Sequence, residues 1–210
     1  MGKVQKDFGL YEVKTEHDAC GIGAVVNISG KADHSIINYG KEILVNLHHR
    51  GAAGADETTG DGAGILMQIP HEFFFAQSKN LKINLPSAGN YAVAMVFSPK
   101  EETLRNKCLD ILKQAIKLHG MKIIGSRVVP VKPDCLGKIA LEAEPYISQI
   151  FIDACGFNDA ELERKLFLAR KKTEKQVREK FGEAASDFYI CSMSGRTICY
   201  KGMFMAWQLF

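Results

Sequence analysis

Cys20 stands at the start of a run of small and β-branched residues, in the segment HDACGIGAVVNISG at 17–30. A thiol placed there can act as a nucleophile when a base lies close to it. Taken alone, the residue is better explained as a small buried hydrophobe, which is the usual state of a free cysteine. A Cys–His pair with His48 or His49 is a third role, because such partners are distant in sequence. The segment by itself leaves all three open.

The glycine-rich loop GAAGADETTGDGAG at 51–64 is the second segment whose composition suggests chemistry. Backbone N–H groups in such loops can bind phosphate. This loop, however, lacks both the Gly-Lys-Ser/Thr end of a Walker A motif and the G-x-G-x-x-G dinucleotide fingerprint. The carboxylates of Asp56, Glu57 and Asp61 would also repel phosphate. We therefore interpret it as a tight loop that needs positive φ angles or a close backbone approach.

Composition excludes several classes of protein. With 210 residues, 46% hydrophobic and 24% charged, the chain is typical of a globular domain. A net charge of +3 is too small to indicate nucleic-acid binding. The six cysteines show neither C-x-x-C pairs nor zinc-ligand spacing, and no secretory or membrane-spanning apolar segment occurs. Reduced thiols and a cytoplasmic location are the resulting expectations, with neither nucleic acid nor membrane as a partner.

Hydrophobic periodicity predicts helices that alternate with short strands. The apolar positions of 36–47 indicate a helix capped by Asp33 or Ser35 and ending near His48–Gly51. Further helices are expected at 101–119 and 159–181, the latter with a solvated, charge-rich face, and strands at 20–28, 65–69, 91–97, 123–131 and 147–152. Residues 188–191 and 197–200 are expected to form a hairpin around 192–195. This order of elements predicts an α+β or layered α/β domain.

Several motifs, taken in order, resemble one family. They are CGIG at 20–23, LHHRGAAGAD at 47–56, GDGAGIL at 60–66, YAVAMVF at 91–97, RVVPV at 127–131, the Leu136-Gly137 pair and SGRTICYKGM at 194–203. The set is similar to the N-terminal glutaminase domain of the large subunit of glutamate synthase, a class II glutamine amidotransferase. It covers nearly the whole chain from Cys20 to Met203.

The resemblance implies an N-terminal-nucleophile hydrolase fold, a four-layer αββα sandwich that is here incomplete at its C-terminus. Residues 1–19 would then be a propeptide, and cleavage before Cys20 would leave residues 20–210 as a partial amidotransferase domain. The freed α-amine of Cys20, with an ordinary pKa of about 8, would serve as the base for its own thiol. Glutamine would be hydrolysed to glutamate and ammonia through a γ-glutamyl thioester.

The same resemblance implies three substrate-binding residues. Arg196 would bind the α-carboxylate of glutamine, where its planar fork makes a bidentate contact that Lys cannot reproduce. Thr197 would add a hydrogen bond beside it. Arg50, in the His-Arg-Gly motif, would lie near the nucleophile, in a structural or a catalytic role.

The family's full-length enzymes would carry FMN and an iron–sulfur cluster in later domains, and would take electrons from a small donor subunit or ferredoxin. Ammonia would pass to 2-oxoglutarate within the same polypeptide. No cofactor or metal site is predicted within these residues, because the scattered cysteines do not have cluster spacing.

The chain departs from the family pattern in one respect. Family members continue to an Asn-Gly pair, which supplies the oxyanion hole, and to an aspartate that holds the substrate's amino group. No Asn-Gly dipeptide occurs in this sequence. Loss of a single oxyanion donor costs about a hundred- to a thousandfold in rate, so residues 1–210 alone should release little or no glutamate from glutamine. A glutaminase assay in which release is robust and depends on Cys20 would contradict this.

Two other hypotheses remain at this stage. One is a different class II amidotransferase, for example one that feeds amidophosphoribosyl transfer, which the GDGAG and SGRTICYKGM segments argue against. The other is a non-catalytic remnant or interaction fragment, in which Cys20 would stay internal to an unprocessed chain. Strand edges and an apolar face left uncovered are expected in any incomplete domain of this type.

Overall fold

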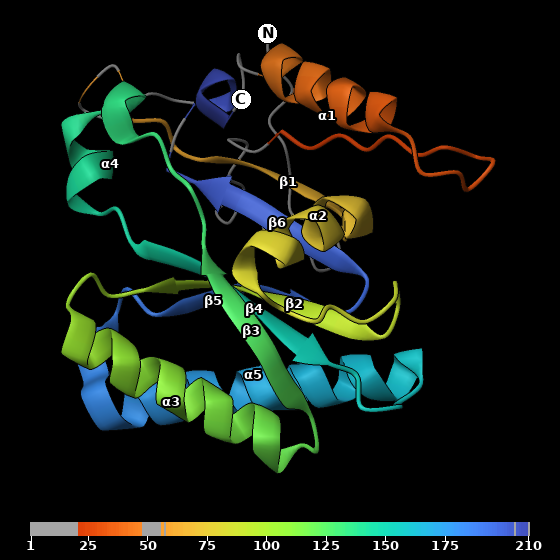
Figure 1. The fold of residues 1–210 in the computed structure, drawn as a ribbon. Helices are drawn as coiled ribbons and strands as arrows, with labels where there is room; N and C mark the ends of the chain where they lie inside the picture. The colour runs from red at the N-terminus through yellow and green to blue at the C-terminus, as the bar shows by residue number, and fades with distance from the viewer. Residues whose placement is uncertain (1–20, 48–55, 57, 204, 210) are drawn as a thin grey trace, which may run out of the picture.

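The computed structural model describes residues 21–47, 56, 58–203 and 205–209. Helices and strands are stacked in four layers, with two sheets between outer helices (Figure 1). The longer elements are α1 (His34–Asn46), β1 (Ala63–Gln68), α2 (His71–Leu81), β2 (Tyr91–Ser98), α3 (Glu102–Leu118), β3 (Lys122–Val128), β4 (Tyr146–Asp153), α5 (Asp159–Phe181), β5 (Tyr189–Ser194) and β6 (Thr197–Gly202). Short helical turns are η3 (Pro133–Cys135), α4 (Lys138–Glu142), η4 (Gly182–Ala185) and η5 (Ala206–Leu209). The predicted α+β class is confirmed.

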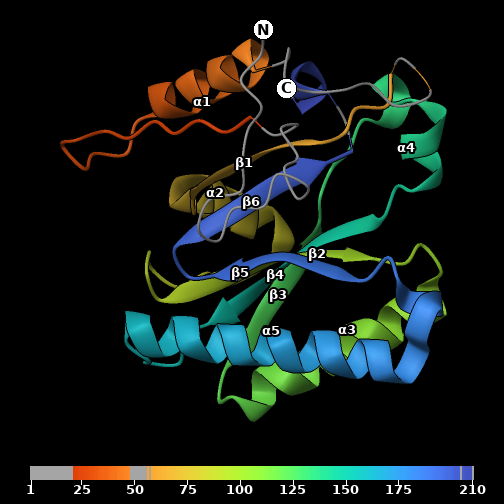
Figure 2. The ribbon, with the colours of Figure 1, turned by 180° about the vertical axis from the view of Figure 1, so that it is seen from behind.

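The larger sheet has the order β3-β4-β2-β5, and all of its neighbouring strands are antiparallel. Its central strand, β2, is buried on both faces, which explains why YAVAMVF is an unbroken apolar run. Alternate β2 side chains face α3 and α5, which cover the outer face of this sheet (Figures 1 and 2). That core contains Ala92, Ala94, Val96, Leu112, Ile116, Ile152, Leu162 and Leu166.

The other β2 side chains form a second core, which connects the larger sheet with the two-stranded sheet of β1 and β6. Phe74 of α2 is completely buried there, in the same cluster as Phe151 of β4 and Ile198 of β6. Its ring meets that of Phe151 edge-on, with the centroids 5.2 Å apart. Helix α2 therefore fills part of the space between the sheets, while α1 lies beyond the β1–β6 pair (Figure 2).

Helix ends follow the capping residues in the sequence. Asp33, rather than Ser35, caps α1, and its Oδ1 accepts a hydrogen bond from the Ser35 N–H at 2.7 Å. Asn158 and Glu161 form a reciprocal capping box at the start of α5. Helix α1 ends at Asn46, two residues before the predicted end, which lies outside the described residues.

The prediction of a buried strand at 20–28 is wrong for the residues described. Residues 21–27 form no strand, and Ile22 and Val26 are 95% and 80% exposed. Their β-branched side chains suit a strand, but a strand also needs a partner whose backbone groups accept its hydrogen bonds. In the part of the chain that is described, β1 and β6 pair only with each other. The expected uncovered apolar side chains are thus present.

The two strands predicted at 188–191 and 197–200 are present as β5 and β6, but the prediction that they pair as a hairpin is wrong. Ser192–Ser194 belong to β5, and the turn is formed by Gly195 and Arg196. The two strands pair with different sheets, β5 with β2 and β6 with β1. The chain turns a corner here and passes from one layer to the next.

None of the described helices is both long enough and apolar enough to cross a lipid bilayer.

Burial of Phe74 predicts a large effect of its removal. Phe74→Ala should lower the free energy of unfolding by about 3–5 kcal/mol, because it empties a site between the two sheets. Phe75→Ala is the control: this neighbour is 46% exposed, and about 1 kcal/mol or less is expected. Denaturant unfolding monitored by circular dichroism measures both variants. Equal losses would contradict the assigned position of Phe74 as the link between the sheets.

Candidate functional site

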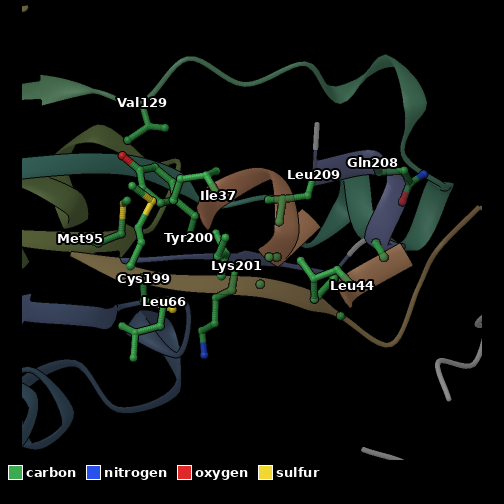
Figure 3. Close-up of a pocket in the computed structure, with 18 of the residues that line it drawn as sticks. Ile37, Leu44, Leu66, Met95, Val129, Cys199, Tyr200, Lys201, Gln208 and Leu209 are labelled. Atoms are coloured by element: carbon green, nitrogen blue, oxygen red, sulfur yellow. The ribbon is translucent and has the colours of Figure 1, made fainter. Parts of the chain in front are cut away.

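A large cavity of 2690 Å³ lies between α1 and the β1–β6 pair and continues toward β2. Figure 3 shows Ile37 and Leu44 of α1 on one side of it, with Tyr200 of β6 and Met95 of β2 also in its lining. The Tyr200 hydroxyl accepts a hydrogen bond from Gln149 Nε2 at 3.0 Å, and burial raises the pKa of this tyrosine. Most of the lining is apolar, so polar groups at its rim would decide what binds there.

Several of the segments singled out in the sequence line this cavity, the one after Cys20 and the one after Arg196 among them. Residues Gly21–Val26, which directly follow Cys20, line it, and so does Thr197. Cys20 and Arg50 themselves lie outside the described residues, as do His48 and His49. The structure therefore brings the segment after the predicted nucleophile and Thr197 to one cavity.

Helix α5 holds the turn that carries Arg196. The Glu163 carboxylate accepts hydrogen bonds from the Gly195 N–H at 2.7 Å and from the Ser194 hydroxyl at 3.0 Å. The Ser194 oxygen in turn accepts from the N–H groups of Arg196 and Thr197, at 2.9 and 3.2 Å. A Cβ at Gly195 would lie 3.0 Å from a Leu162 methyl carbon, so the turn fits tightly against α5.

The Arg196 side chain makes a bidentate ion pair with Asp159, in the first turn of α5. Its Nε lies 2.9 Å from each carboxylate oxygen, and its Nη2 lies 2.5 Å from Oδ2. The hydrogen bonds from the guanidinium lower the pKa of Asp159, so this carboxylate is charged at neutral pH. Both side chains are exposed, at 58% and 63%. Arg196 does not line the cavity.

The glycine-rich loop is tied to a segment about 80 residues further along the chain. Asp56 accepts hydrogen bonds from the N–H groups of Thr59 and Ile139, at 2.6 and 3.2 Å. The buried Thr59 hydroxyl accepts from the Ala140 N–H at 3.4 Å. The two side chains thus cap α4, and the contact with Thr59 lowers the pKa of Asp56. The contacts agree with the interpretation of this segment as a tight loop with a close backbone approach, but the composition of the loop does not indicate that Asp56 caps α4.

Gly137 is required by this contact. A Cβ at this position would overlap the Asp56 carboxylate and the Thr59 hydroxyl. The Leu136-Gly137 pair in the sequence is therefore a packing requirement. The glycine just before a short helical pattern indicates a close contact at this position. The sequence does not indicate that the contacting residues lie about 80 positions earlier.

The described thiols are poor nucleophiles at three positions. Burial raises the pKa of Cys108 and Cys155, and it raises that of Cys191 to about 12. Cys191 instead donates a weak hydrogen bond to the Cys199 carbonyl, with 3.6 Å between sulfur and oxygen. Within the described ranges, no three His, Cys, Asp or Glu side chains are grouped to hold a metal ion.

Comparison with known proteins identifies the family. Residues 20–210 match the family model for class-II glutamine amidotransferases. The chain belongs to this family of enzymes.

The matching relatives are glutamate synthases. The chain is 40% identical over 204 residues to the glutamate synthase [NADPH] large chain of Bacillus subtilis, covering 96% of this chain and 13% of that protein. It is 37% identical over 213 residues to the glutamate synthase [NADH] of Saccharomyces cerevisiae, covering 96% and 10%. It is 37% identical over 194 residues to the ferredoxin-dependent glutamate synthase of Pyropia yezoensis, covering 92% and 12%. The chain thus spans about an eighth of the length of these relatives.

The cap on α4 leads to a stability prediction. Gly137→Ala should lower the free energy of unfolding by about 1–3 kcal/mol, because its methyl group forces Asp56 and Thr59 away from the helix N-terminus. Lys138→Ala is a suitable control, since that side chain is 85% exposed and the change should have an effect within about 0.5 kcal/mol. Thermal and urea unfolding compare the two. A wild-type midpoint for Gly137→Ala would show that the contact does not constrain the loop.

Proposed function

We propose that residues 20–210 form part of a glutaminase domain that hydrolyses L-glutamine to glutamate and ammonia within a glutamate synthase. One observation carries the proposal: the segment that directly follows Cys20 lines the same cavity as Thr197. The family match, which starts at residue 20, supports the same assignment. Residues 1–19 are proposed to be a propeptide, removed by cleavage of the Ala19–Cys20 bond.

Cys20 is the proposed nucleophile. Its freed α-amine takes the thiol proton, and the thiolate attacks the side-chain amide carbon of glutamine. Collapse of the tetrahedral intermediate breaks the C–N bond, and the protonated α-amine returns the proton to the leaving ammonia. Water then attacks the γ-glutamyl thioester, which restores the thiol and releases glutamate. The described cysteines with raised pKa values do not compete for this role.

Substrate orientation is assigned to Arg196, Thr197 and Arg50. Arg196 would bind the α-carboxylate, and Thr197, which lines the cavity beside it, would add a hydrogen bond. Arg50 is proposed to lie near the nucleophile because it belongs to the His-Arg-Gly motif at 49–51, which the resemblance to the family includes. Glutamine is small compared with the cavity, so these polar groups would select it.

The complete reaction would use parts of the polypeptide that the alignment to relatives does not reach. FMN and an iron–sulfur cluster would supply the electron transfer that reduces the product of ammonia and 2-oxoglutarate. The described residues do not fit such a cluster, because no three of their His, Cys, Asp or Glu side chains are grouped as metal ligands. The relatives include NADPH-, NADH- and ferredoxin-dependent enzymes, so the donor subunit or ferredoxin stays a prediction, as does a cytoplasmic location.

Replacement of Cys20 tests the proposal. In the protein expressed from its complete reading frame, Cys20→Ser should reduce glutaminase activity about a thousandfold or more, because the nucleophile is lost. Cys155→Ser, at an exposed thiol that does not line the cavity, should retain wild-type activity. Mass spectrometry of wild-type protein treated with an electrophilic glutamine analogue should find the adduct on a peptide that begins at Cys20. A retained 19-residue leader without an adduct would overturn the assignment.

A further inference from the structure

The backbone of Arg196 is bonded to residues that line the cavity, but its side chain is bound to Asp159. The Arg196 carbonyl accepts a hydrogen bond from the Ile69 N–H at 3.0 Å, and both Ile69 and Thr197 line the cavity. The guanidinium is held by Asp159, away from that lining. To contact a ligand inside the cavity, the side chain must leave Asp159.

Two carboxylates of α5 bind different parts of this turn. Glu163, which is partly buried, binds the backbone through Gly195 and Ser194. Asp159, one helical turn earlier and exposed, binds only the guanidinium among the contacts described. Opening the Arg196–Asp159 pair therefore leaves the backbone of the turn in place. The side chain can change its partner without a change of fold.

Asp159 presents the same chemistry as the ligand that Arg196 is proposed to bind. Its two carboxylate oxygens accept hydrogen bonds from Nε and Nη2 of Arg196. The α-carboxylate of an amino acid would accept from the same two groups. An exposed ion pair of this kind is weak, because water solvates both charges in the open state. Replacement of Asp159 by another carboxylate therefore costs little free energy. The fraction of Arg196 bound to each carboxylate depends on the affinities of the two for the guanidinium.

We propose that Asp159 is an internal competitor for the α-carboxylate of glutamine and so sets the affinity of the site for its substrate. In the free protein Asp159 holds the Arg196 side chain; when glutamine enters, its α-carboxylate replaces Asp159 on the guanidinium. The inference rests on the proposed function of Arg196 and adds to it a residue that determines affinity without touching the substrate.

Steady-state glutaminase kinetics of Asp159→Asn, in the protein from its complete reading frame, test this proposal. The KM for glutamine should fall about two- to fivefold, the range set by exposed ion pairs, while kcat stays unchanged. Asp159→Glu, which keeps a carboxylate, should stay near wild type. Asp110→Asn is the matched control, because Asp110 is an exposed acid paired with Lys113 on α3. An unchanged or raised KM in Asp159→Asn would overturn the competition.

Arg196→Lys separates this inference from the proposed function. If Arg196 binds the α-carboxylate, the lysine variant should raise KM at least about tenfold, and adding Asp159→Asn to it should no longer lower KM. If KM rises in Arg196→Lys but does not fall in Asp159→Asn, the competition by Asp159 is wrong, and the substrate role of Arg196 stands. An unchanged KM in Arg196→Lys removes the substrate role of Arg196, and the competition with it. Absence of glutaminase activity in wild-type protein defeats both.

Discussion

Burial of β2 on both faces is the constraint on which the other layers depend. Its alternating side chains contribute to two cores at once, one under α3 and α5 and one toward α2 and β6. A charged residue in this strand would lie in one core or the other, where an unpaired charge is costly. The position of the smaller sheet, and of the cavity beside it, follows from the second core, which contains both Phe74 of α2 and Ile198 of β6.

The turn that carries Arg196 lies where the chain passes from the larger sheet to the smaller one. Glu163 fixes the Ser194–Arg196 turn at that corner through hydrogen bonds to backbone and hydroxyl. In a second contact of the same kind, Asp56 and Thr59 attach the glycine-rich loop to the N-terminus of α4. Both contacts use a carboxylate to satisfy backbone N–H groups, which is a strong and directional interaction. Two loops far apart in sequence are thereby held by acids that perform no chemistry themselves.

Family membership and geometry support the function at different levels. The match over residues 20–210 identifies a class-II glutamine amidotransferase, whereas the structure shows which described segments line the same cavity. The exposed ion pair between Arg196 and Asp159 adds a feature that similarity alone does not suggest. If Asp159 competes with substrate, affinity is tuned from a helix outside the cavity, and it can vary among relatives without any change in the residues that contact glutamine.

The sequence by itself determined the local elements and the family. Apolar runs and periodicity located β2, α3, β4 and α5, because burial of those segments depends on patterns within a few residues, and the ordered motifs around Cys20 and Arg196 indicated the amidotransferase. Tertiary structure decided which strands pair, so the predicted strand at 20–28 and the 188–200 hairpin were wrong: a strand needs a partner elsewhere in the chain. It also decided that Asp56 caps α4 and that Asp159 binds Arg196, because contacts between residues 37 and 83 positions apart leave no periodic signal.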